Sequence, residues 1–146
     1  MDDAALELRN VTYRLFVELG GRPSADAVAE SLGLAVESVR RGWQRLHDAH
    51  ALVLDSEGEV RMANPFSGVP TPYRVEAAGR SWYANCAWDA FGICAALHVD
   101  GRIDAACPDC GEPIVVEVRD HRPDDESLVF HSLVGAGHWW DDIVFT

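Results

Sequence analysis

The chain has 146 residues and carries 12 basic side chains against 24 acidic ones, a formal net charge of −12 at pH 7. Because non-specific affinity for nucleic acid comes from accumulated Lys and Arg, this charge argues against a protein that wraps DNA or RNA. Hydrophobic residues make up 48% of the chain, which is enough for a buried core.

No stretch of the sequence has the pattern of a membrane span or an export signal. There is no run of about 18 apolar residues, and no basic start followed by an apolar stretch. We therefore expect a cytoplasmic protein with no membrane partner. Its four cysteines are then better interpreted as thiols or metal ligands than as a disulfide framework.

The N-terminal part of the chain predicts a helix-turn-helix followed by a hairpin. Apolar positions recur at helical spacing over residues 4–19, and a glycine pair should end this helix. Ser24 is a good N-cap for a short second helix, and a third helix should cover about 36–47. Strand-like segments at 51–54 and 60–62 flank a polar turn. Three helices and such a hairpin are typical of a winged helix.

The third helix carries the candidate DNA contacts of this module, Arg40, Arg41 and Arg45. Acidic residues on the same helix and on the hairpin interrupt the basic surface. We therefore favour a winged helix that is kept as a structural or dimerising scaffold over one that binds DNA.

We expect two domains, a winged-helix module over residues 1–63 and a small mixed α/β domain over 64–146. The proline-containing segment 64–72 should be an extended linker that packs on the second domain. Within that domain, β-branched and aromatic residues predict short strands around a central helix, over residues 73–76, 80–83, 102–105, 114–118 and 128–133. The expected fold class is α+β. Because the chain ends on aromatic and apolar residues, we expect that relatives possess a C-terminal continuation that this sequence lacks.

The central helix carries the most distinctive chemistry. Cys86 and Asp89 lie three residues apart in an apolar stretch, so on a helix they share one face. We expect Asn85 to be the N-cap, which places Cys86 in the first turn, where the helix dipole stabilises a thiolate. Hydrocarbon around Asp89 should raise the pKa of its carboxyl group. The thiol would then attack soft electrophiles while the carboxyl group holds a proton.

A second thiol pair follows in Cys107-Pro-Asp-Cys110-Gly111, which resembles one knuckle of a zinc ribbon. A structural zinc site needs four ligands, and the second Cys-x-x-Cys is missing. Three interpretations of this pair therefore stay open: it binds zinc, it binds a softer metal such as mercury, or its cysteines only form a turn. Cys94 should be a buried core thiol. Trp88 is expected in the core or as the wall of an apolar pocket near Cys86.

One part of the sequence resembles the core of the alkylmercury (organomercurial) lyase family, namely Trp82-Tyr-Ala-Asn-Cys-Ala-Trp-Asp-Ala-Phe-Gly-Ile93 followed by Cys107. The likeness extends back through Asn64-Pro-Phe-Ser67 and forward to Trp139-Trp-Asp-Asp142. It implies that Cys86 is the nucleophile that binds mercury, since thiolate is a soft ligand for a soft metal. It also implies that Asp89 protonates the departing carbon.

The sequence departs from the family's pattern at the second mercury ligand. Better-known members use another cysteine in a strand near the C-terminal end of the core, and the corresponding residues here, 128–132, contain no thiol. Either lyase activity is lost, or another cysteine substitutes, in which case Cys107 and Cys110 join Cys86 as mercury ligands. The resemblance implies no cofactor beyond the mercury(II) of the substrate. The implied partners are an organomercurial and cellular thiols.

Two other functions stay open at this level. One is a winged-helix transcriptional regulator that senses a metal or thiol oxidation, for which the arginines of the third helix would hold DNA. The other is a homologue that binds a soft metal or zinc without turnover. If bound zinc stabilises its fold, a chelator should unfold it.

Overall fold

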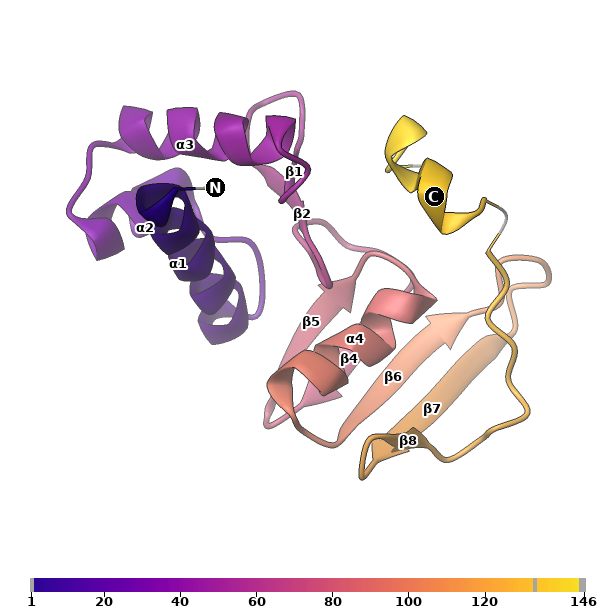
Figure 1. The fold of residues 1–146 in the computed structure, drawn as a ribbon. Coiled ribbons are helices and arrows are strands. Elements are labelled where there is room, and N and C mark those ends of the chain that lie inside the picture. Colours follow the sequence, from indigo (N-terminus) through magenta and orange to yellow (C-terminus); the bar gives the residue numbers. More distant parts are fainter. Residues whose placement is uncertain (1, 133, 145–146) are drawn as a thin grey trace.

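The computed structural model describes residues 2–132 and 134–144 and confirms the α+β class, with helices first and an antiparallel sheet after them (Figure 1). The helices of the N-terminal part are α1 (Asp3–Leu19), α2 (Ala25–Leu32) and α3 (Val36–Asp48). Ser24 caps α2 as expected, because its side chain accepts a backbone N–H at 3.1 Å. The three helices pack around Trp43, whose indole N–H donates to the Thr12 hydroxyl at 2.9 Å.

The strands form one antiparallel sheet in the order β1-β2-β3-β5-β4-β6-β7-β8. Their bounds are β1 (Val53–Leu54), β2 (Val60–Ala63), β3 (Phe66–Ser67), β4 (Arg74–Ala77), β5 (Arg80–Ala84), β6 (Gly101–Ala106), β7 (Pro113–Arg119) and β8 (Arg122–Pro123). The predicted linker is extended, and part of it pairs with β2 and β5 as strand β3. The hairpin of the N-terminal part therefore joins the main sheet.

Helix α4 (Ala87–Leu97) connects β5 to β6 and covers one face of β4, β5 and β6 (Figure 1). Arg74, the first residue of β4, pairs with Tyr83 of β5 on one side and with Asp104 of β6 on the other. Both neighbours run antiparallel to β4, so they run parallel to each other and finish at the same end of the sheet. We call this the thiol end, because Cys86 follows β5 and Cys107 follows β6 there.

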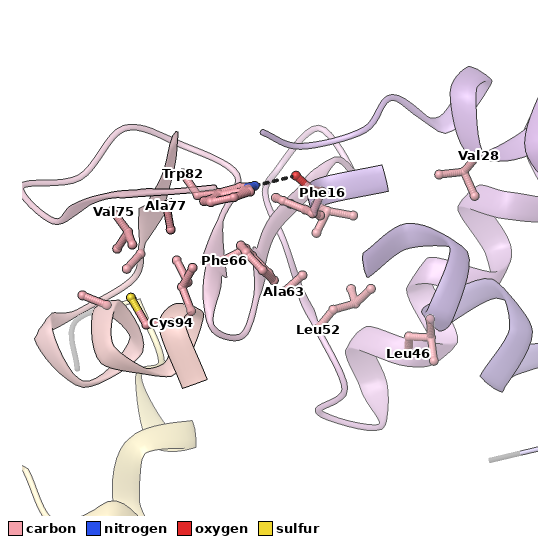
Figure 2. Packing of buried hydrophobic residues seen from close by; sticks show 14 of the residues in the cluster. Phe16, Val28, Leu46, Leu52, Ala63, Phe66, Val75, Ala77, Trp82 and Cys94 are labelled. Carbon is pink, nitrogen blue, oxygen red and sulfur yellow. Dashed lines mark hydrogen bonds between the residues drawn. The ribbon is translucent and has the colours of Figure 1, made fainter. Parts of the chain in front are cut away.

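One continuous cluster of buried apolar side chains joins the N-terminal helices to the sheet. Phe16 of α1, Phe66 of β3 and Trp82 of β5 lie at its centre, with ring centroids 6.0 Å apart for Phe16 and Phe66 and 6.2 Å apart for Phe66 and Trp82. The Trp82 indole N–H also donates to the Phe16 carbonyl oxygen at 3.0 Å (Figure 2). The two predicted domains, 1–63 and 64–146, therefore share a core, and the boundary between them stays a prediction.

The strand predicted at 128–133 is wrong for its described part. Residues 128–132 have no regular secondary structure and are exposed, and Leu133 lies outside the described residues. The outer partner of β7 is instead the short β8, which lies in the charged loop. Residues 128–132 therefore form no strand, although their composition favours one. A 3₁₀ helix, η1 (Ala136–Asp141), follows. In the described part of the chain no helix is long and apolar enough to cross a membrane.

Candidate functional site at the thiol end

Cys86 is itself the N-cap of α4, so the prediction that Asn85 caps this helix is wrong by one residue. Pairing of β5 extends the backbone through Ala84, and Cys86 is still extended at φ −150° and ψ 179°. The Cys86 side chain forms no capping hydrogen bond, although the backbone N–H groups of Trp88 and Asp89 are near enough to lower the pKa of its thiol. The Asn85 side chain turns instead to Asp89, where Nδ2 donates to Oδ2 at 3.0 Å. Strand β5 thus delivers the thiol directly to the start of the helix.

The pKa of the Cys86 thiol is raised, whereas its place at a helix N-terminus predicted a stabilised thiolate. Burial is the largest cause, because it removes water from the charged form. The two backbone N–H groups lower the pKa, while the negative charge of Asp89 and its hydrogen bond with the thiol raise it. Desolvation and the neighbouring carboxylate together outweigh the helix terminus.

Burial likewise raises the pKa of the Asp89 carboxyl group, in the predicted direction. Hydrogen bonds from the Asn85 amide and the Cys86 thiol oppose this rise. The Asn85 Nδ2 group also contacts the Asn64 Oδ1 and the Phe66 carbonyl oxygen, at 3.1 and 3.3 Å, which ties the start of α4 to β3 and the turn before it. The thiol and the carboxyl group therefore form one hydrogen-bonded pair that retains a proton.

Trp88 is not a core residue, since 63% of its surface is exposed beside the Cys86–Asp89 pair. Its ring lies 6.1 Å, centroid to centroid, from the ring of Phe130 in the segment after β8. Phe91, one helical turn after Trp88, is also partly exposed. The helix that carries the pair therefore exposes aromatic side chains next to it.

The Cys107–Cys110 segment forms the turn between β6 and β7, and we call this turn the knuckle. The Cys107 N–H donates to the Glu112 carbonyl oxygen at 2.8 Å, and the Gly111 N–H donates to the Cys107 carbonyl oxygen at 2.9 Å. Gly111 has φ +73°, a left-handed conformation that favours glycine. Hydrogen bonds from the backbone N–H groups of Cys110 and Asp109, and then from the Cys110 thiol, lower the pKa of Cys107.

The knuckle does not become a four-ligand zinc site. Within residues 2–132 and 134–144, no three His, Cys, Asp or Glu side chains lie close enough together to hold one metal ion. All four cysteines are free thiols. Cys94 is buried in the core as predicted (Figure 2), and its sulfur packs against Gly101. The turn therefore supplies two thiols, which is half of what a structural zinc ion needs.

The structure brings Cys107 to the same end of the sheet as Cys86, which the sequence did not indicate. Strands β5 and β6 flank β4, so the strands that lead to the two cysteines lie about 10 Å apart, twice the usual strand spacing. Tyr73, directly before β4, lies between them. Burial raises the pKa of its hydroxyl, and the charges of Cys86 and Cys107 raise it further. Sequence reasoning missed Tyr73, and only its position before the middle strand could have pointed to it.

The three arginines proposed as DNA contacts lie on α3, away from the thiol end (Figure 1). Arg40 forms an ion pair with Glu59 of the β1–β2 hairpin at 2.7 Å, and Arg41 donates to the Ser38 hydroxyl at 3.1 Å. Arg45 is exposed. The Arg40 side chain thus links α3 to the β1–β2 hairpin.

Comparison with known proteins identifies one family and one similar solved structure. Residues 66–146 match the family model described as alkylmercury lyase. A search of curated proteins finds no match. Among solved structures, the chain is similar in fold to the crystal structure of the mercury-bound form of MerB2, with 22% sequence identity and a TM-score of 0.65. The alignment covers 86% of this chain and 60% of that one.

Proposed function

Since this chain belongs to the alkylmercury lyase family, we propose that it cleaves carbon–mercury bonds, with Cys86 binding the mercury and Asp89 protonating the leaving carbon. The observation that carries this proposal is the hydrogen-bonded pair itself, in which a thiol contacts a carboxyl group whose pKa burial has raised. A soft nucleophile and a retained proton are the two groups that the reaction needs.

In the first step the Cys86 sulfur bonds to mercury. An organomercurial R–Hg–X approaches, the thiol proton passes to the Asp89 carboxylate, and X⁻ leaves as the sulfur–mercury bond forms. The raised pKa of the thiol keeps it protonated until then, and the carboxylate that contacts it is the base within reach. The products of this step are Cys86–S–Hg–R and a neutral Asp89.

In the second step Asp89 returns the proton to carbon. The electron pair of the carbon–mercury bond stays with carbon, the hydrocarbon R–H leaves, and a small thiolate becomes the second ligand of the mercury on Cys86. Burial favours the neutral carboxylic acid, so Asp89 can donate near neutral pH. The Asn85 amide, at 3.0 Å from Oδ2, holds the carboxyl group in place for the transfer.

The surface beside the pair supports an organic substituent as the leaving group. Trp88 and Phe130 present aromatic faces there, with Phe91 next to them on α4. An alkyl or aryl group would lose contact with water on this surface, which favours binding. The reaction is expected in the cytoplasm, where small thiols are abundant and the four free cysteines stay reduced.

We further propose that residues 1–63 form a winged-helix module that serves as a scaffold. The order of α1, α2, α3 and the β1–β2 hairpin supports the winged-helix assignment. The ion pair between Arg40 and Glu59 and the core shared through Phe16 support a scaffold role over DNA binding.

The test is an anaerobic assay of the purified protein with an arylmercurial and excess small thiol, in which the released hydrocarbon is followed. We expect release by the wild type, none by Cys86→Ser, and a loss of about 100-fold to 10,000-fold in Asp89→Asn, the range for removal of a general acid. Cys94→Ala is the matched control, because it removes a buried thiol that the mechanism does not use. Release that survives in Cys86→Ser would contradict the proposal.

A further inference from the structure

The knuckle at the β6–β7 turn is the second group of soft ligands in the described part of the chain, and the two steps above do not use it. Cys107 and Cys110 lie within hydrogen-bonding reach of each other through their sulfurs, and both are free thiols. Backbone hydrogen bonds from Cys107 to Glu112 and from Gly111 to Cys107 close the turn that holds them together. Two thiols are therefore already positioned to bind one ion.

The number of ligands at the knuckle favours mercury over zinc. Zinc in a structural site takes four ligands in a tetrahedron, and the described residues offer no cluster of even three. Mercury(II) is softer and is satisfied by two thiolates in a nearly linear arrangement, so Cys107 and Cys110 form a complete site for it. Cys110 is exposed and Cys107 partly exposed, which leaves the site open to ions from solvent.

The position of the knuckle connects it to Cys86. Cys107 lies at the thiol end, about two strand spacings, or about 10 Å, from the strand that delivers Cys86. Tyr73 lies between the two and is influenced by the charge of both. Among the described residues Cys86, Cys107 and Cys110 do not form one group of metal ligands, but an ion that leaves Cys86 emerges at the same end of the sheet as the two-thiol site.

We propose that Cys107 and Cys110 form an acceptor site that binds the mercury(II) released from Cys86 after carbon–mercury cleavage. This inference rests on the proposed function. A small thiol HX first displaces the ion, so that Cys86–S–Hg–X and HX give Cys86–SH and HgX₂. The knuckle then exchanges both ligands, so that HgX₂ and two thiols give Cys107–S–Hg–S–Cys110 and two HX. Two sulfur–mercury bonds break and two form in the second exchange, and no oxidant or reductant takes part.

The second exchange is favourable because the two protein thiols are linked. Once one of them has displaced a small thiolate, the other is held close to the ion at a high effective concentration. Cys86 is thereby returned to its protonated state, ready for another organomercurial. The ion waits on the exposed turn, where an acceptor protein or a large excess of thiol can remove it.

The first experiment measures binding of inorganic mercury(II) to Cys86→Ser protein, in competition with a small thiol, by the ultraviolet absorption of sulfur–mercury bonds. This variant has no lyase nucleophile, so the result does not depend on turnover. We expect one ion per chain. A second substitution, Cys107→Ser or Cys110→Ser, should lower the affinity at least about 100-fold, because it leaves only one of the two linked thiol ligands. The matched control, Cys86→Ser with Cys94→Ala, should bind as Cys86→Ser does. Equal affinity in all four proteins would overturn the site.

The second experiment follows one turnover of an arylmercurial by the wild type with a limited amount of small thiol, then alkylates free thiols and maps them by mass spectrometry. We expect hydrocarbon release with Cys107 and Cys110 protected and Cys86 alkylated. Hydrocarbon release with Cys86 protected and the knuckle alkylated would overturn the acceptor role while the lyase proposal stands. A lack of hydrocarbon would overturn the lyase proposal and the acceptor role with it, and the first experiment would still decide whether the knuckle binds mercury.

Discussion

Cys86 and Cys107 have the same local backbone pattern, but the pKa values of their thiols are shifted in opposite directions. At each cysteine the backbone N–H groups two and three residues later lower the pKa of the thiol, Trp88 and Asp89 for the first and Asp109 and Cys110 for the second. The pKa of Cys86 is nevertheless raised, chiefly by burial, and the pKa of Cys107 is lowered, chiefly by these N–H groups. The backbone N–H groups thus favour the thiolate at both sulfurs, but they outweigh desolvation only at Cys107, where water still reaches the sulfur.

The side chain three residues on adds to the difference. After Cys86 it is a carboxylate, whose negative charge opposes ionisation of the thiol, and after Cys107 it is a thiol that donates a hydrogen bond. The first arrangement keeps a proton for transfer to carbon, and the second keeps sulfur ready to bind an ion. The division of labour that we propose rests on the closed turn at Cys107 and its place at the thiol end, and this contrast agrees with it.

Asp89→Asn should bring Cys86 closest to the behaviour of Cys107. The substitution removes the negative charge and keeps a carbonyl oxygen that can accept from Asn85, so the pKa of the Cys86 thiol should fall. Alkylation of Cys86 at neutral pH should then be faster, because more of it is thiolate. The rate is measured by mass spectrometry at that cysteine. Asp104→Asn is the control, since Asp104 pairs with Arg102 on the sheet, and an equal acceleration in both variants would contradict the role of Asp89.

Cys110→Ala should move Cys107 in the opposite direction, by a smaller amount. It removes the hydrogen bond from the Cys110 thiol and leaves the two backbone N–H groups, which are the larger causes of the lowered pKa. The pKa of Cys107 should rise, and its alkylation at neutral pH should slow. Cys110→Ser, which retains a hydroxyl donor, should slow it less. A faster reaction in Cys110→Ala would show that the thiol does not donate to Cys107.

The smallest expected effect is on stability. The folded pKa of Asp89 lies above its ordinary value of 3.8, so the unfolded chain loses this proton first as the pH rises. At pH values above the raised pKa, ionised Asp89 therefore lowers the free energy of unfolding. At pH values below the ordinary pKa, Asp89 is neutral in both states and has no such effect. Asp89→Asn should be more stable than the wild type at neutral pH, and the difference should shrink to zero as the pH falls through this window. Denaturant unfolding at a series of acidic pH values measures it, and a difference that grows on acidification would contradict the raised pKa.

Local patterns in the sequence predicted most of the elements. Ser24 and the glycines after α1 and α2 act within one helical turn, so capping could be recognised without the fold. The Cys107–Cys110 knuckle is equally local, since its turn depends on residues next to each other and on Gly111. The predicted strand at 128–133 failed because a strand needs a partner, and no alternating pattern tells which segment that partner is.

The sequence by itself determined which residue types carry the chemistry, Cys86 with Asp89 three positions on and the Cys107–Cys110 pair, because these spacings act within one turn of chain. Tertiary structure alone decided their surroundings. Burial reversed the expected direction of the pKa shift of Cys86. The packing of the elements also left Trp88 exposed and placed Tyr73 between two thiols. Tertiary structure had these effects because desolvation depends on every element that packs against a group, and because the pairing of β5 and β6 on either side of β4 joins residues whose separation along the chain carries no such information.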